Sequence, residues 1–145
     1  MKAVIQRVKQ TSLSVDGNLV SEIPFGLAVY LGVKAGDSED CPKIMAGKIS
    51  RLRIFEDDNG KMNLSVSDVG GEIMLISQFT LYGDCSHGNR PSFTMAERPE
   101  RANALYEKTA EELRGLGLTV KTGIFGADMK IRQFNDGPVT VIFEI

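Results

Sequence analysis

The segment Glu72-Ile-Met-Leu-Ile-Ser-Gln-Phe-Thr-Leu81 is the strongest β-strand signal in the sequence. It follows two glycines and is rich in apolar and β-branched residues, which favour a buried strand. Successive side chains of a strand point to opposite faces, so one face would carry Met74, Ile76, Gln78 and Thr80. This face starts apolar and ends in two hydrogen-bonding groups. The pattern therefore predicts a buried strand with polar side chains at its carboxyl end.

Two interpretations of Gln78 and Thr80 fit this pattern. A buried polar group without a partner costs about 1–3 kcal/mol, so each side chain needs either a partner or a ligand. In a structural interpretation, Gln78 makes a cross-strand hydrogen bond and Thr80 is present for its β-propensity. In a functional interpretation, both side chains belong to a ligand site at the end of the strand.

The remaining pattern predicts more strands than helices. Apolar periodicity of about 3.6 residues favours two helices, Ser38–Leu52 and Pro99–Gly115. Alternating segments favour strands at Met1–Lys9, Ser12–Ile23 (a hairpin around Asp16-Gly17-Asn18), Phe25–Val33, Leu118–Gly123, Asp128–Phe134 and Val139–Ile145. Short connections predict an α+β fold in a single domain, residues 1–145, with a mostly antiparallel, barrel-like or two-layer sheet covered by two helices.

Composition narrows the class of protein. Lys and Arg total 17 against 19 Asp and Glu, a net charge of −2 that gives no indication of DNA binding. One histidine and two cysteines outside a CxxC motif predict neither a metal site nor a disulfide framework. No nucleotide-phosphate or dinucleotide motif is present, so we expect no cofactor. Without a membrane span or a signal-peptide pattern, we expect a cytoplasmic protein.

A second informative stretch is Phe134-Asn-Asp-Gly-Pro-Val-Thr-Val141. Asn, Asp, Gly and Pro are typical turn residues, so Gly137-Pro138 is explained as the turn between two strands. Roughly 5–6% of X-Pro bonds in folded proteins are cis, and a cis bond is usually a specific structural feature. A cis Gly-Pro would hold two backbone carbonyls on a rigid turn.

Together, S-Q-F-T-L at 77–81 and N-D-G-P-V-T at 135–140 resemble the D-aminoacyl-tRNA deacylase family, the D-Tyr-tRNA(Tyr) deacylases. The resemblance covers nearly the whole chain. It includes M-K-A-V-I-Q-R-V at the start, Y-G-D with G-N-R-P-S-F at 82–93, and G-I-F-G-A-D-M at 123–129. Each motif alone is weak, but their order and the chain length make the combination specific.

The resemblance implies an activity and a partner. Members hydrolyse the ester that joins a D-amino acid to the 3′ end of tRNA, and they are homodimers with active sites at the subunit interface. The resemblance further implies that Gly137-Pro138 is cis and enters the partner subunit's site, where its carbonyls exclude L side chains, with Asn135 beside it. Arg7 would brace this turn. Exclusion of this kind tolerates many D-amino acids and accepts glycine.

For the chemistry, the resemblance points to Thr80, Gln78 and Ser77. A threonine nucleophile needs a base, and the sequence offers none nearby, so we expect Thr80 to position the ester for attack by water. The family also suggests help from the 2′-hydroxyl of the terminal ribose. Phe79 and Met129 are the expected pocket-lining side chains.

Two other functions remain open at this stage. A non-catalytic tRNA- or RNA-binding module would display aromatic side chains for base stacking, and the sequence has no Trp and three Tyr. A threonine-dependent esterase or amidase would act on free small molecules.

Overall fold

The central element of the fold is β1 (Lys2–Val15), a strand of 14 residues that pairs along both of its edges. The computed structural model describes residues 1–145. β1 pairs antiparallel with β2 (Asn18–Ile23) and β3 (Gly26–Gly32) on one edge and with β8 (Met129–Glu144) on the other. The alternating N-terminal pattern predicted this strand, although as two pieces. The hairpin around Asp16 and Gly17 is confirmed, and both residues have the positive φ that a tight turn requires.

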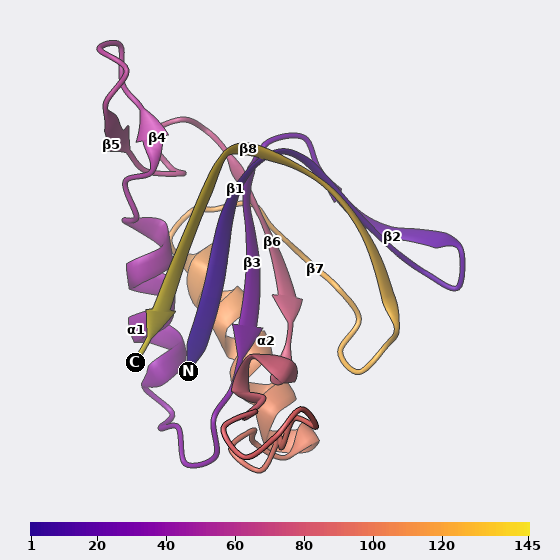
Figure 1. The fold of residues 1–145 in the computed structure, drawn as a ribbon. Helices are drawn as coiled ribbons and strands as arrows, with labels where there is room; N and C mark the ends of the chain where they lie inside the picture. The colour runs from indigo at the N-terminus through magenta and orange to yellow at the C-terminus, as the bar shows by residue number, and fades with distance from the viewer.

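Beyond β3, the strands of the sheet pair in parallel. β6 (Glu72–Ser77) pairs parallel with β3, and β7 (Val120–Thr122) pairs parallel with β6. A hydrogen bond from Ser21 Oγ of β2 to the carbonyl of Thr122 brings the two ends of the sheet together. The result is a nearly closed, mixed, barrel-like sheet, in which the expected antiparallel pairings are confined to β1 and its neighbours (Figure 1).

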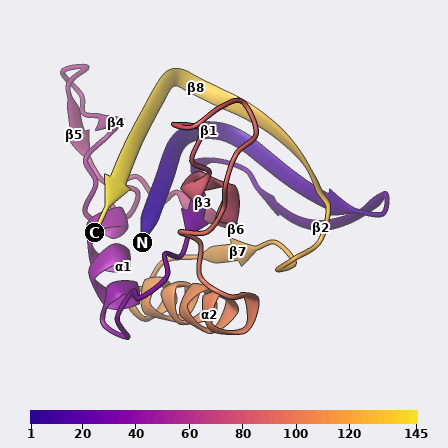
Figure 2. The same cartoon turned by 60° about the horizontal axis from the view of Figure 1, so that its bottom comes forward.

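Two helices cover one side of this sheet, as Figure 2 shows. α2 (Pro99–Gly115) begins and ends where the sequence predicts, with proline in its first turn and Arg114 in its last. α1 (Cys41–Ser50) is shorter than predicted but likewise carries proline in its first turn. Both helices bury their apolar faces in one core with the start of β1, where Ala3 and Ile5 are fully buried. No helix combines the length and apolar content needed to cross a bilayer.

The predicted strand at residues 72–81 is too long by four residues. β6 ends at Ser77, and a 3₁₀-helix, η1 (Phe79–Tyr82), follows. The chain turns here because its parallel partner ends at Gly32, and it then passes over that glycine. A β-carbon on Gly32 would lie 3.0 Å from the Gln78 carbonyl oxygen and 3.2 Å from the Tyr82 ring.

The predicted reversal at Gly137-Pro138 is also wrong. β8 is one strand that runs along almost all of β1, from Met129 opposite Val15 to Glu144 opposite Lys2. The turn residues form a bulge within this strand, and β8 bends there (Figure 1). The turn residues Asn135–Pro138 therefore mark a bulge within one strand rather than a reversal between two strands.

The structure also contains a small hairpin that was not predicted from the sequence. β4 (Phe55–Glu56) and β5 (Met62–Leu64) flank the Glu56-Asp-Asp-Asn-Gly60 turn and project from the main sheet (Figure 1). The side chain of Asp57 accepts hydrogen bonds from the backbone N–H groups of Asn59 and Lys61. These contacts fix the turn and lower the pKa of the Asp57 carboxyl.

Candidate active site

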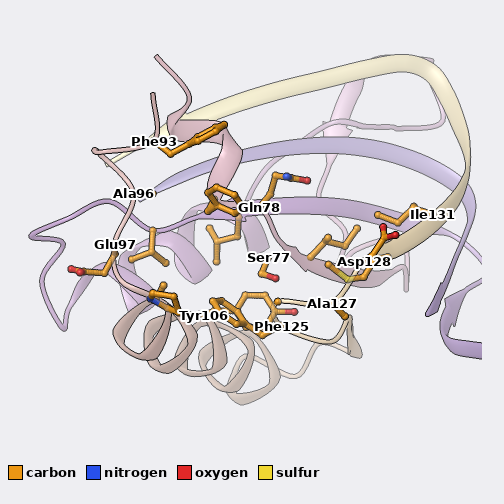
Figure 3. A pocket seen from close by; sticks show the side chains of 18 residues that line it. Ser77, Gln78, Phe93, Ala96, Glu97, Tyr106, Phe125, Ala127, Asp128 and Ile131 are labelled. Carbon is orange, nitrogen blue, oxygen red and sulfur yellow. The ribbon is translucent and has the colours of Figure 1, made fainter. Parts of the chain in front are cut away.

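A cavity of about 620 Å³ opens where β6 ends, between the sheet and the first half of α2. Twelve of its 18 lining residues are hydrophobic, as is usual for small-molecule sites. Figure 3 shows Ser77 facing Tyr106 and Phe125 across the cavity, with Glu97 at one end and Asp128 and Ile131 at the other. The end of β6, the start of α2 and the loop before β8 therefore form one pocket.

Four of the predicted site residues line this cavity: Ser77, Gln78, Phe79 and Met129. Ser77 and Gln78 hold their places through the sheet, because Ser77 pairs with Leu31 and the Gln78 N–H donates to the Leu31 carbonyl at 2.8 Å. Phe79 is 57% exposed and packs edge-on against Phe93, with ring centroids 5.1 Å apart. Phe79 is thus a wall of the pocket rather than part of the core.

Thr80 lies beside the cavity in η1, with its side chain exposed. Its hydroxyl oxygen accepts a hydrogen bond from the side-chain amide of Gln78. Both side chains were expected on one face of a strand, and the 3₁₀ turn brings them into contact instead. An amide N–H₂ donates protons and does not accept them, so Gln78 orients the hydroxyl without activating it as a nucleophile.

Two ionisable side chains at the cavity, Glu97 and Tyr106, already have hydrogen-bond partners within the chain. The backbone N–H of Arg98, the side chain of Arg101 and the N–H of Gly36 all donate to Glu97, and they lower the pKa of its carboxyl. Burial raises the pKa of Tyr106 to about 12, and its hydroxyl donates to the Leu75 carbonyl at 2.8 Å. Neither group is poised to exchange a proton near neutral pH.

The other predicted residues gather at a second place, the bulge in β8. The Gly137–Pro138 peptide bond is cis, and both residues are exposed. Gly137 has φ +123°, a conformation that residues with a β-carbon rarely adopt. Arg7 lies beneath the bulge and donates to the Asp136 carbonyl at 3.3 Å. Asn135 is exposed just before the bulge and bonds to Gln133.

The cavity residues and the residues of the β8 bulge do not meet within one chain. Arg7 pairs with Leu27 of β3, whereas Ser77 pairs with Leu31 of the same strand through β6. Four strand residues span about 13 Å, and Gly137 and Pro138 are not among the cavity's lining residues. Within this chain the Gly137-Pro138 turn is therefore separate from the pocket.

Sequence reasoning missed three aromatic residues of the pocket: Phe93, Tyr106 and Phe125. Tyr106 belongs to the apolar face of α2, and helical spacing does not reveal which part of such a face lines a cavity. Phe93 and Phe125 lie in two motifs, G-N-R-P-S-F and G-I-F-G-A-D-M, that the resemblance included. The position of these motifs was the signal that could have identified both residues.

Comparisons with known proteins identify the family of this chain and agree with its fold. The family model of D-Tyr-tRNA(Tyr) deacylase matches residues 4–144. A D-aminoacyl-tRNA deacylase from Desulfotalea psychrophila is 54% identical over 99% of this chain and 97% of its own length. One from Halalkalibacterium halodurans is 53% identical over 99% of each chain.

Solved structures show the same fold. A structure titled c-Myc DNA Unwinding Element Binding Protein is 42% identical in sequence and has a TM-score of 0.92. The match covers 100% of this chain and 99% of that one. Another, titled a probable eukaryotic D-amino acid tRNA deacylase, shares the fold at a TM-score of 0.84 and 18% identity, over 99% of this chain and 98% of its own. The chain belongs to the D-Tyr-tRNA(Tyr) deacylase family.

Proposed function

We propose that this protein hydrolyses the ester bond between a D-amino acid and the 3′-terminal adenosine of tRNA, and that it thereby removes D-amino acids from mischarged tRNA. It is a D-aminoacyl-tRNA deacylase, an ester hydrolase, by family. The observation that carries the proposal is the aromatic cavity beside Gln78 and Thr80.

The cavity suits the terminal nucleoside of tRNA. Its volume of about 620 Å³ falls within the range of roughly 300–1,000 Å³ typical of small-molecule sites. Phe79, Phe93 and Phe125 offer ring surfaces on which a base stacks, which is a common way to recognise an unpaired nucleotide. With the nucleoside in the cavity, the ester at its ribose lies toward the rim, where Thr80 is exposed.

Hydrolysis proceeds by attack of water on the ester carbonyl carbon. The bond to the ribose 3′ oxygen breaks, this oxygen takes a proton, and free amino acid and tRNA leave. Thr80, held by Gln78, and Ser77 position the ester and stabilise the developing oxyanion, together with backbone N–H groups at the start of η1. The ribose 2′-hydroxyl of the substrate assists the attacking water.

Selection for D-amino acids uses a second copy of the chain. The exposed Gly137-Pro138 turn of one subunit enters the partner subunit's pocket, where its backbone carbonyls exclude an L side chain. Supporting this dimer, Phe79, Phe134 and Ile142 are 57%, 64% and 65% exposed, so large apolar side chains are available for an interface. A D side chain points away from the turn, and glycine has nothing to exclude, so glycyl-tRNA(Ala) is also a substrate.

The test compares three substrates with the wild-type protein: D-tyrosyl-tRNA, the same tRNA ending in 2′-deoxyadenosine, and free D-tyrosine ethyl ester. The proposal predicts fast release from the first, at least about 100-fold slower release from the second, and negligible release from the third. Equal rates on the free ester would identify a small-molecule esterase. Tight binding of charged tRNA without release would identify a binding module.

A further inference from the structure

The bulge that carries Gly137 and Pro138 receives little support from the sheet. On β1, Val8 pairs with Asn135 and Gln6 pairs with Thr140, so Arg7 alone faces the four residues 136–139. These four residues have no ladder partners on β1. Their conformation therefore depends on side-chain contacts, and the side chain beneath them is that of Arg7.

We propose that Asp136 is a positioning residue that fixes the Gly137-Pro138 turn by orienting Arg7, and that its carboxylate thereby sets the discrimination between D- and L-aminoacyl esters. The inference rests on the proposed function of the turn. It goes further because it assigns a role to a residue outside the turn's own Gly-Pro pair, and because that role acts through Arg7.

Two nitrogens of the Arg7 guanidinium donate hydrogen bonds, to Asp136 and to Ile54, and the third faces the carboxylate of Glu56. Nε donates to the Asp136 carbonyl at 3.3 Å and lies 3.1 Å from Asp136 Oδ2. Nη1 donates to the Ile54 carbonyl at 2.7 Å, and Nη2 lies 3.8 Å from Oε1 of Glu56. Because the guanidinium is a rigid planar fork, these contacts fix its orientation together.

This orientation is transmitted to the turn by close contact. Nη2 of Arg7 lies 3.4 Å from the point where a β-carbon on Gly137 would be placed, so the guanidinium abuts the backbone of the turn. Asp136 holds Arg7 from the side of the bulge, while Ile54 and Glu56 hold it from the β4–β5 hairpin. A shift of the guanidinium toward the hairpin would remove this support.

Among the ion pairs of this cluster, the one between Arg7 and Asp136 is the shortest and the least exposed to water. The Arg7 side chain is 7% exposed and that of Asp136 is 32% exposed, so the pair is shielded from water on one side. Lys9 also lies 3.3 Å from Asp136 Oδ1, but it is 62% exposed, and exposed pairs of this kind contribute little. Removing the Asp136 carboxylate would leave Arg7 buried with Glu56 as its nearest anion, at 3.8 Å.

The experiment compares Asp136→Ala and Asp136→Asn with Asp58→Ala, an exposed aspartate on the β4–β5 turn. For each, the ratio of kcat/KM on D-tyrosyl-tRNA to that on L-tyrosyl-tRNA is measured. We expect D136A to lower this ratio at least about tenfold, D136N to fall between D136A and wild type because it keeps an acceptor oxygen, and D58A to match wild type. D136A on an Arg7→Met background should add no further loss.

A second readout does not depend on catalysis. Solvent exchange of the Arg7 Nε–H proton, followed by NMR, should be slow in wild type and D58A and at least about tenfold faster in D136A. An unchanged D/L ratio in a folded D136A protein overturns the inference, and so does additive loss on the Arg7→Met background. A wild-type protein without D preference overturns the proposed function, and with it the role of Asp136 in discrimination. The exchange rate of the Arg7 Nε–H proton then still decides whether Asp136 holds the guanidinium.

Discussion

Replacing Gly137 by alanine tests how tightly the turn is constrained. A β-carbon there would lie 2.8 Å from Val139 Cγ2 and 2.9 Å from the Val139 nitrogen, closer than such contacts allow. The backbone φ of +123° adds strain of about 1–3 kcal/mol for a residue with a side chain. The matched control is Gly60→Ala, where φ is +72° and a β-carbon would meet nothing within 4 Å, so only a backbone cost of about 1 kcal/mol remains.

The free energy of unfolding in urea is the assay for this pair of variants. We expect Gly137→Ala to lose about 3 kcal/mol and Gly60→Ala about 1 kcal/mol, which correspond to Tm decreases of roughly 6–12 °C and 2–4 °C for a chain of this size. The same Gly137 variant should release L-tyrosine from tRNA faster than wild type, because the displaced carbonyls no longer exclude the L side chain. Equal unfolding free energies for the two variants, or an unchanged rejection of the L-ester, would mean that the turn is not constrained at Gly137.

Three further results are expected. Thr80→Val should lower kcat on D-tyrosyl-tRNA by about 100-fold or more while Thr80→Ser retains most of it, because the hydroxyl positions the ester; equal loss in both would contradict this role. If the turn acts across the dimer, mixing Thr80→Val subunits with Gly137→Ala subunits should give heterodimers with one D-selective site, whereas selection within one subunit would leave all activity unselective. Burial raises the pKa of Tyr106 to about 12 against roughly 10 when unfolded, so Tyr106 should account for about 2 kcal/mol of the stability lost as pH rises from 10 to 12, and urea titrations of Tyr106→Phe should show a decrease smaller by that amount.

The strands and helices were predictable where local chemistry and tertiary packing agree. α2 matched its predicted ends because proline opens it and a glycine-rich segment closes it. The first strand and its hairpin followed from alternation around Asp16 and Gly17. The parallel pairings of β3, β6 and β7 were not predictable, since they depend on crossovers whose partners the sequence does not reveal.

The site was predicted less completely, and for related reasons. Gln78 and Thr80 were expected on one face of a strand, but the end of β3 at Gly32 forces a 3₁₀ turn that period-two reasoning does not capture. The Asn135–Pro138 stretch carries ordinary turn chemistry, and only tertiary pairing with β1 decides that it bulges instead of reversing. The sequence therefore singled out four residues that line the cavity, Ser77, Gln78, Phe79 and Met129, while their arrangement required the fold.

We propose that the protein releases amino acids from tRNA according to their chirality. The decisive measurement is amino-acid release from D-tyrosyl-tRNA and L-tyrosyl-tRNA in parallel by the wild-type protein. We expect rapid release from the D-ester and release from the L-ester no faster than spontaneous hydrolysis. Comparable enzymatic release from both esters, or from neither, would contradict it.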